Sequence, residues 1–498
     1  MGTATALEVF WVKIEEVLSK LGKVLDSGKR EEFLWFDVQT TPLTREDYAS
    51  LEERFEKAGH HVKVLNAGSA LNRVTGEEVQ RVWLVAFRSR KELEQWMEEF
   101  EERKKKDHRY IGEQLDWFHV QEDILGPGLP LLHPKGMVIR NSLIELMREV
   151  NSRLGAQEVW TPHIAKATLW KMSGHYDHYR DKMFIWEQDG EEWGIKAMNC
   201  PMHIQIYRFR PRSYRELPIR YAEFATVYRK EQSGELHGLS RVWSLTQDDH
   251  HFIVRPDQIK GEVVRILRAA QGVYELFGFP YKVKLATKPD DAMGDPKLWE
   301  EAELGLKEAL KVAGVEYELK PKDGAFYGPK IDIYVKDSMG RWWQLTTIQL
   351  DFFMPENFHM SYVDASGKRK QPVIIHFAIL GSLERFMSVI IEHTAGRLPF
   401  WLAPDQVRVL PVSERQADYA REVVNELRGL GVRAELSAGG TLSKRVLQAE
   451  TEKVAVIAVV GEKEKQAGKV SIRGGETLSR EEFKERLLLA VMERKMSV

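Results

Sequence analysis

The spacing of hydrophobic residues in the first 90 positions predicts a small unit of mixed helices and strands. Apolar residues recur every three to four positions over residues 5–25 and 44–59, which is the period of an amphipathic helix. Thr44 and Gly59 bound the second helix as an N-cap and a stop. Alternating apolar residues predict strands at residues 33–40, 60–67 and 81–87.

Residues 89–106 predict a charged amphipathic helix that ends in a basic run, where lysines suit the helix dipole. From residue 107 to residue 400, short aromatic-rich strands follow one another with few helices between them. Consecutive strands of this kind are typical of an antiparallel sheet and therefore of an α+β fold. The expected strands lie at residues 159–164, 221–229, 239–247, 341–354 and 371–380.

Strands and helices alternate regularly after residue 401, which predicts a separate α/β domain of about 95 residues. Neither a P-loop nor a GxGxxG sequence occurs, so these two glycine-rich phosphate cradles are absent. We expect four parts: a small α/β domain at 1–88, a linker helix at 89–106, the α+β domain at 107–400 and the α/β domain at 401–498.

The composition of the 498 residues narrows the class of protein. A hydrophobic content of 43% with 30% charged residues excludes an intrinsically disordered chain. No apolar run approaches the roughly 18 residues that a membrane helix needs, so we expect a soluble, cytoplasmic protein with no membrane partner. A single cysteine excludes a disulfide framework and a zinc site built on cysteine pairs. The net charge of −2 leaves a nucleic-acid partner open, because a local basic surface suffices.

Three clusters of polar residues lie on strand-like segments of the 107–400 region, at residues 199–203, 228–234 and 246–251. Acids and histidines inside an apolar strand are costly unless they are paired or bound to a ligand. Each cluster taken singly would be an ordinary ion pair or a satisfied histidine. Their chemistry becomes specific only when they are considered together.

Together these segments resemble the class II aminoacyl-tRNA synthetases. Residues 220–252, RYAEFATVYRKEQSGELHGLSRVWSLTQDDHHF, resemble motif 2, and IIHFAILGSLERF resembles motif 3 with Gly381 and Arg385. Pro162 is placed like the proline of motif 1. The ordered segments AMNCPMH, TQDDxH, GAFYGPKIDI, TTIQLDF and HFAILGSLERF are similar to those of threonyl-tRNA synthetases. The resemblance covers roughly residues 107–490 and implies an antiparallel catalytic domain followed by an anticodon-binding domain.

The resemblance implies that Cys200, His251 and His376 bind one Zn²⁺ per chain. Their spacing matches no local zinc pattern, and without the resemblance they would be a buried thiol and two core histidines. Three protein ligands leave an open position on the metal. In the family, the amino group and hydroxyl of threonine occupy that position, so valine, which has no hydroxyl, is rejected strongly.

The threonine pocket is implied in the same way. His250 and His251 both follow the acids, and the pattern TQDDxH selects His251. Alternation along a strand places Gln247 and Asp249 on the same face as His251. Asp249 is expected to accept a hydrogen bond from the substrate hydroxyl. The residues implied around threonine are Met198, Gln247, Asp249, Tyr327 and Gln349.

ATP with Mg²⁺ is expected against motifs 2 and 3. Attack of an anionic carboxylate on the α-phosphorus needs positioning and charge neutralisation rather than a general base. Arg229 is expected to bridge the carboxylate and the α-phosphate, and Arg385 to hold the γ-phosphate and cap the adenine. Further candidates for this site are Glu231, Arg241, Gln344, Thr347, Lys330 and Ser382.

His175, in SGHYDHY, matches a family histidine that assists proton movement during transfer to tRNA, although a purely structural hydrogen bond is an equal alternative. In the last domain, Glu464 and Arg473 match the family's anticodon-reading residues, with a surface ion pair as the alternative. The sequence departs from the family pattern at three positions near the site, Leu245, Met202 and Phe377.

The resemblance therefore implies a homodimeric enzyme that activates L-threonine with ATP and transfers it to tRNA(Thr). The alternatives are a synthetase-like RNA-binding protein and a class II synthetase for serine or proline. The N-terminal 90 residues are short for the family's editing domain, and the bacterial form of that domain needs a cysteine that this chain does not have to spare. We expect a short, archaeal-like form without its own editing site and with a separate editing protein.

Overall fold

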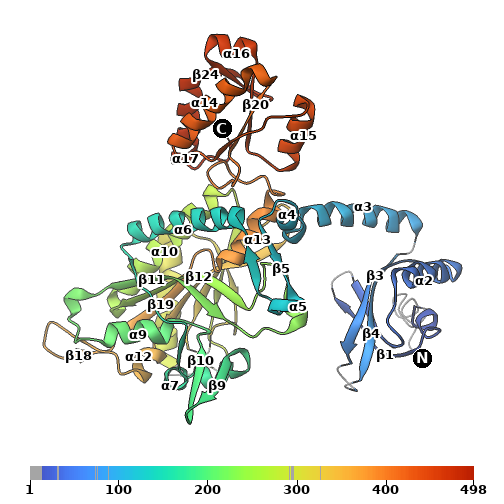
Figure 1. Ribbon diagram of the computed structural model, residues 1–498. Coiled ribbons are helices and arrows are strands. Elements are labelled where there is room, and N and C mark those ends of the chain that lie inside the picture. Colours follow the sequence, from blue (N-terminus) through green and yellow to red (C-terminus); the bar gives the residue numbers. More distant parts are fainter. Residues whose placement is uncertain are drawn as a thin grey trace. The chain divides into compact units, whose positions relative to one another are not determined.

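The computed structural model describes residues 14–30, 33–72, 75, 77–87, 89–290, 292, 296–325 and 327–497 (Figure 1). The chain forms two compact units, Met1–Lys104 and Lys105–Val498. Within the described part, no helix combines the length and the apolar character required to cross a membrane.

The N-terminal unit contains an antiparallel sheet with the strand order β1-β2-β4-β3. Helix α2 (Arg45–Lys57) buries Leu51 and Phe55, and Thr44 caps it as predicted by accepting from the backbone of Asp47. Helix α3 (Arg90–Lys106) follows the sheet. The strands are β1 (Lys23–Arg30), β2 (Phe33–Gln39), β3 (His61–Leu71) and β4 (Glu78–Phe87).

The prediction of a helix over residues 5–25 was wrong at its C-terminal end. Residues 5–13 lie outside the described residues, residues 14–18 are helical, and β1 already begins at Lys23. At Gly22 an added Cβ would lie 2.0 Å from the carbonyl oxygen of Gln39. Glycine therefore allows the close backbone approach at which β1 starts to pair with β2.

An eight-stranded sheet dominates the second unit, with the order β14-β13-β15-β16-β19-β12-β11-β7. All neighbouring pairs are antiparallel except β13·β14 and β11·β7, which confirms the expected α+β class. The strands are β7 (Gln157–Glu158), β11 (Ile219–Tyr228), β12 (Ser244–Val254), β13 (Tyr281–Ala286), β14 (Tyr317–Lys320), β15 (Lys330–Lys336), β16 (Trp342–Asp351) and β19 (Val373–Ala378).

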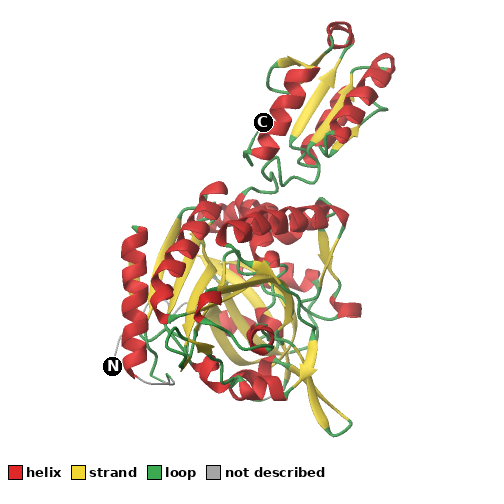
Figure 2. Cartoon of the chain, turned by 90° about the vertical axis from the view of Figure 1, so that its left-hand side faces the viewer, coloured by secondary structure: helices red, strands yellow, loops and turns green. Residues whose placement is uncertain are grey.

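Five helices share one hydrophobic core with this sheet, and the unit has a second core. Figure 2 shows helices packed alongside the strands. The five helices are α4 (His108–Gln114), α6 (Pro134–Leu154), α10 (Ile259–Leu276), α11 (Pro296–Ala313) and α13 (Leu383–His393). The second core contains residues of α9 (Cys200–Arg208), α12 (Phe353–Asn357) and strands β11, β12 and β19. A small sheet of β8 (Ile164–Lys166), β10 (Glu191–Ile195) and β9 (Phe184–Gln188) precedes α9.

Two predicted strands differ from the structure. Residues 159–163 are not strand, and only Gln157–Glu158 and Ile164–Lys166 pair with other strands. Pro162 has no N–H to donate to a ladder, and the N–H of Thr161 bonds a side chain of β11 instead. The strand predicted at 239–247 begins only at Ser244, because Trp243 and Arg241 bond to loop residues.

The C-terminal domain has a five-stranded sheet, β21-β20-β22-β23-β24, in which β21, β20 and β22 are parallel. This confirms the expected α/β class. Helices α16 and α17 and strand β24 were not predicted. The elements are β20 (Val407–Pro411), α14 (Ala417–Gly429), β21 (Ala434–Leu436), α15 (Leu442–Thr451), β22 (Val456–Val460), α16 (Glu462–Ala467), β23 (Lys469–Ile472), β24 (Thr477–Ser479) and α17 (Arg480–Met492).

Candidate active site

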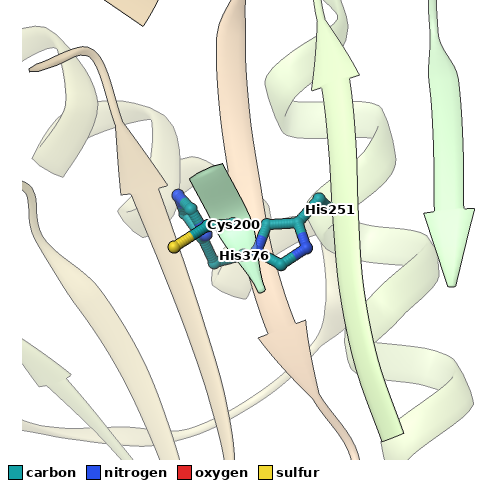
Figure 3. Close-up of side chains that lie close together, drawn as sticks. All are labelled: Cys200, His251 and His376. Carbon is teal, nitrogen blue, oxygen red and sulfur yellow. The ribbon is translucent and has the colours of Figure 1, made fainter. Parts of the chain in front are cut away.

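Cys200, His251 and His376 form a buried cluster where α9 meets the large sheet (Figure 3). Cys200 is the first residue of α9, and the two histidines are directly paired across β12 and β19. One ligand atom from each residue lies within 4.8 Å of the other two. Residues separated by up to 176 positions therefore converge on one point.

The donor set of this cluster fits a zinc ion. Burial raises the pKa of the Cys200 thiol and lowers the pKa of His251, so the neutral forms are favoured until a cation is present. One thiolate and two imidazoles suit zinc, with a position left for substrate. Each histidine also has a partner of its own, as metal-binding histidines usually do. Asp351 Oδ2 lies 3.0 Å from Nε2 of His376.

The partner of His251 is His203, whose Nδ1 lies 2.8 Å from Nδ1 of His251. Nε2 of His203 lies 2.8 Å from Glu223 Oε2. Glu223 in turn accepts from Lys196 Nζ at 3.3 Å and from the backbone N–H of Thr161 at 3.0 Å. Burial opposes ionisation of Glu223, but the hydrogen bond from His203 and the charge of Lys196 lower its pKa. A buried polar chain thus runs from Thr161 to the cluster of Cys200, His251 and His376.

The implied threonine residues lie beside the cluster. Asp249 accepts from the Asn199 amide at 2.9 Å, while Tyr327 donates to Gln349 Oε1 at 2.9 Å. Gln349 is paired with His376 across β16 and β19. Met198 packs against the apolar residues around Cys200, and Gln247 lies two positions from Asp249 on the same face of β12.

A cavity of about 370 Å³ opens next to these residues. Of the eight candidates named for the ATP site, all but Lys330 line this cavity, together with Gln247 and Leu245. The seven are Arg229, Glu231, Arg241, Gln344, Thr347, Ser382 and Arg385.

The cavity is rich in guanidinium groups. Burial, with Arg241 and Arg229 nearby, lowers the pKa of Arg385, whose Nε donates to the carbonyl oxygen of Ser240 at 3.0 Å. Nε of Arg229 donates to the carbonyl oxygen of Ala197 at 3.2 Å. Repulsion among these cations would be relieved by a polyanion, so the electrostatics favour a phosphate chain.

Glu231, which lines the cavity, and Lys330, which does not, are both paired with opposite charges. Burial raises the pKa of Glu231, but hydrogen bonds from Arg241 and Lys182 reverse the effect and lower it. Lys330 Nζ lies 3.0 Å from Asp332, and Lys330 pairs with Gln349 across β15 and β16. Its ammonium group is therefore already matched by a carboxylate.

His175 begins the short helix α8 (His175–Tyr179), and its Nδ1 lies 2.9 Å from Ser173 Oγ. Burial lowers its pKa to about 4, with Asp351 opposing the effect and His376 and Arg229 adding to it. His175 is therefore neutral at physiological pH.

His250 lies on the other face of β12 from His251. Its Nε2 lies 2.6 Å from Asn151 Oδ1, and its ring stacks on Phe377 at 4.3 Å. The structure therefore brings His251, not His250, to Cys200. Phe377, one of the departures from the family pattern, serves as this stacking partner, and Met202 packs in a small apolar cluster with Trp170.

In the C-terminal domain, Glu464 and Arg473 have different partners. Glu464 accepts from the Gly461 N–H and from Ser471 Oγ, both at 2.9 Å. Arg473 Nε donates to Glu450 Oε1 at 2.7 Å. Both oxygens of Glu464 therefore have a local structural role in addition to any contact with RNA.

Several residues of the site had no role in the sequence interpretation. Glu223, Asp351 and Lys196 were not singled out, and Asn199 and His203 were noted only as unusual polar residues. The available signal was an acid within an apolar strand, as for Glu223 in YAEFATVYR, which is costly unless it is paired. Glu223 and His203 are far apart in the sequence, so the sequence does not show that they form a pair.

Comparison with known proteins gives two family matches. Residues 183–394 match the tRNA synthetase class II core domain (G, H, P, S and T), and residues 406–494 match an anticodon binding domain.

The curated relatives agree with these matches. The chain is 47% identical to the threonine–tRNA ligase catalytic subunit of Metallosphaera sedula over 83% of this chain and 77% of the relative. It is 43% identical to the subunit of the same name from Sulfurisphaera tokodaii over 91% of this chain and 89% of the relative. A solved structure, the RNA binding domain of threonyl-tRNA synthetase from Cryptosporidium parvum Iowa II, superposes with a TM-score of 0.73 at 39% identity, covering 77% of this chain and 98% of that one.

Proposed function

This chain belongs to the family of threonine–tRNA ligase catalytic subunits, and on that premise we propose how its own residues select threonine, activate it and transfer it to tRNA. The enzyme joins threonine to tRNA with ATP in a class II core, a reaction that uses Mg²⁺ with the nucleotide. The observation that carries the assignment of roles is the Cys200–His251–His376 cluster, which lies beside Asp249 and next to the arginine-lined cavity.

Threonine is selected at this cluster. Cys200, His251 and His376 would hold zinc, which when bound coordinates the amino and hydroxyl groups of threonine. Asp249, held by Asn199, accepts the hydroxyl proton in a hydrogen bond. Valine leaves that acceptor unpaired and is rejected far more strongly than a difference in shape would allow.

The threonine pocket is completed by neutral polar groups. Gln247, Tyr327 and Gln349 surround the amino group of threonine, and the hydrogen bond between Tyr327 and Gln349 fixes the orientation of that pair. Met198 supplies an apolar wall beside Cys200. The pocket therefore orients the substrate without supplying a competing nucleophile.

Activation takes place in the neighbouring cavity. Arg229 bridges the threonine carboxylate and the α-phosphate, and Arg385 binds the γ-phosphate. Charge neutralisation and alignment lower the barrier, because the attacking carboxylate is already anionic. Glu231, Arg241, Gln344, Thr347 and Ser382 bind the remainder of the nucleotide, and Lys330 supports the pocket beside Gln349.

Transfer to tRNA involves His175 and two residues of the C-terminal domain. The neutral imidazole of His175 assists the proton that leaves the terminal adenosine hydroxyl. Glu464 and Arg473 contact the anticodon of tRNA(Thr), and the Arg473–Glu450 pair holds the guanidinium at the surface of the C-terminal domain.

We also infer that the enzyme is a homodimer that works in the cytoplasm, where the ribosome consumes its product. Trp160 and Ile164, on either side of Pro162, have exposed fractions of 73% and 50%. Exposed apolar side chains of this size favour a protein interface at the motif 1 segment. Light scattering of the protein and of a Trp160→Glu variant tests this, with a shift toward monomer expected in the variant.

Serine remains a problem for this pocket, because it presents the same amino and hydroxyl groups. We propose that the chain has no editing site of its own and that a separate protein hydrolyses seryl-tRNA(Thr) in trans. The N-terminal unit, with its α2 helix and four-stranded sheet, has no assigned part in this reaction.

The decisive experiment is ATP–pyrophosphate exchange with each amino acid, run with and without a zinc chelator. Threonine-dependent exchange that the chelator abolishes is the expected result. Exchange driven by serine or proline alone would contradict the specificity, and no exchange by zinc-loaded protein would favour an RNA-binding protein without catalysis.

A further inference from the structure

The turn between β19 and α13 carries Gly381 and Ser382, and Arg385 follows in the first turn of α13. All three residues line the arginine-rich cavity. Gly381 has a φ of +82°, and an added Cβ would lie 2.8 Å from the carbonyl oxygen of Leu345. Ser382 caps α13 by accepting from the Arg385 N–H at 3.1 Å. The position of this turn therefore sets the position of Arg385.

The strand ladder does not hold this turn. The last ladder pair between β12 and β19 is His250 with Phe377. Continuing that register would pair Asp248 with Ile379, but Gln247 instead pairs with Ser382. The turn thus contains two extra residues at the point where β19 leaves β12, and their N–H groups need other acceptors.

Asp248 supplies that acceptor. Its Oδ2 accepts from the Ile379 N–H at 2.7 Å, and both of its oxygens lie 3.1 Å from the Leu380 N–H. The side chain is only 1% exposed, and burial raises its pKa to about 7 against the effect of these backbone hydrogen bonds. The carboxyl group lies on the opposite face of β12 from Gln247 and Asp249, so it does not enter the threonine pocket.

Glu384 makes the reverse connection. It lies on α13, is 7% exposed, and accepts from the Thr246 N–H of β12 at 2.8 Å. Arg140, which bonds Thr246 Oγ1 at 3.2 Å, supplies nearby positive charge. The carboxyl group of Asp248 on β12 therefore binds the backbone of the turn, and the carboxyl group of Glu384 on α13 binds the backbone of β12.

Burying a carboxyl group costs free energy, and a buried carboxyl group stabilises the fold less than an apolar side chain of similar volume. Directional acceptors can, however, fix backbone N–H groups that apolar packing cannot orient. We propose that Asp248 and Glu384 are positioning residues for nucleotide binding: they clasp the β19–α13 turn so that Gly381, Ser382 and Arg385 face the triphosphate. This inference rests on the proposed assignment of the cavity to ATP.

Four variants test the clasp. Asp248→Asn keeps the size of the side chain but presents an –NH₂ group to the N–H donors of the turn. Glu384→Ala removes the acceptor of the Thr246 N–H, and Glu384→Gln restores an acceptor oxygen. Asp257→Asn makes the same chemical change at an exposed turn, where the side chain is 67% exposed and bonds only Arg255 among the described residues.

Nucleotide binding is measured directly by calorimetry without amino acid, and the KM values for ATP and threonine are measured by pyrophosphate exchange. We expect Asp248→Asn and Glu384→Ala to weaken ATP binding about ten-fold or more, the scale of an unpaired buried donor. The KM for threonine and the zinc content should stay within about two-fold of wild type. Glu384→Gln should recover most of the loss, and Asp257→Asn should match wild type.

Unchanged ATP binding in a folded Asp248→Asn or Glu384→Ala protein would overturn the inference. Equal losses in ATP and threonine binding would also overturn it, because equal losses indicate a general structural role. If Asp248→Asn does not fold, the Glu384 pair still decides between these outcomes. Wild-type protein that binds no ATP would overturn the assignment of the cavity itself, which is a different result from a variant that leaves ATP binding intact.

Discussion

Nδ1 of His203 lies 2.8 Å from Nδ1 of His251, and this contact fixes how His251 can present itself to a metal. A carboxylate can only accept, so Nε2 of His203 donates to Glu223, and in the tautomer with this single N–H the lone pair lies on Nδ1. That lone pair accepts the Nδ1–H of His251, which leaves the lone pair of Nε2 on His251 for zinc. Asp351 orients His376 in the corresponding way, because its Oδ2 accepts directly from Nε2 of His376.

Replacing His203 should weaken zinc binding without removing a zinc ligand. We expect His203→Asn to lower zinc affinity by about 10–100-fold, the usual effect of losing a residue that orients a metal-bound histidine. Competition with a chromogenic chelator measures the affinity. His359→Asn, at an exposed histidine outside the site, is the matched control. Wild-type affinity in a folded His203→Asn protein would show that the contact does not orient His251.

Cys200→Ser should remove both the metal and threonine activation. A serine hydroxyl does not ionise to replace the thiolate, so two histidines alone must hold the ion. Metal analysis should find one zinc per wild-type chain and almost none in the variant, and pyrophosphate exchange should fall with it. Full activity in a zinc-free Cys200→Ser protein would remove this mechanism.

The sequence predicted the fold best where local signals were strong. Thr44 and Gly59 placed α2 within a residue, and aromatic-rich segments placed β11, β16 and β19. Errors arose where tertiary contacts decided the local structure. The apolar pattern of residues 5–25 predicts a helix, but the close approach at Gly22 allows β1 to begin there. Pro162 interrupts the strand predicted around it.

Prediction of the site depended on the family resemblance, because Cys200, His251 and His376 meet only in three dimensions. The resemblance named the groups expected to touch substrate or metal but not those behind them. A buried acid or histidine, such as His203, Glu223 or Asp248, stands out in an apolar segment, but the sequence does not show which partner it binds.

His175→Ala should slow aminoacylation far more than pyrophosphate exchange, because only the transfer step requires the proton to leave the adenosine hydroxyl. Comparing the two rates in the same preparation measures this. Equal losses in both would instead indicate a defect in positioning or folding.

The pH dependence of that effect is also predicted. Burial lowers the pKa of His175 to about 4, so the folded protein keeps the ring neutral where an ordinary histidine would become charged near pH 6.5. The ratio of wild-type to His175→Ala transfer rates should therefore stay constant from pH 8 to pH 6. A ratio that falls through pH 6.5 would show that the imidazole titrates normally.

Asp37→Ala should destabilise the N-terminal unit by about 3–5 kcal/mol, because it leaves a largely buried guanidinium without its partner. Asp37 is fully buried and binds Arg81 through two hydrogen bonds of 2.6 and 2.7 Å. Asp37 lies on β2, and hydrogen exchange of the β2 amides in increasing urea measures the stability of this unit separately from the rest of the chain. Glu53→Ala, which removes an exposed ion pair with Lys57 in the same unit, should cause no measurable change.

Seryl-tRNA(Thr) should accumulate when this protein acts alone. Serine offers the amino and hydroxyl groups that the cluster and Asp249 recognise and lacks only a methyl group, which provides about 1–3 kcal/mol of discrimination, or 10–200-fold. The only cysteine of the chain, Cys200, lies in the activation site and cannot serve a second site of the cysteine-dependent kind. Purified protein given preformed seryl-tRNA(Thr) should therefore deacylate it no faster than buffer does, and charging assays with serine should yield a stable product. Hydrolysis clearly above the buffer rate would place an editing site on this chain and would remove the need for a separate editing protein.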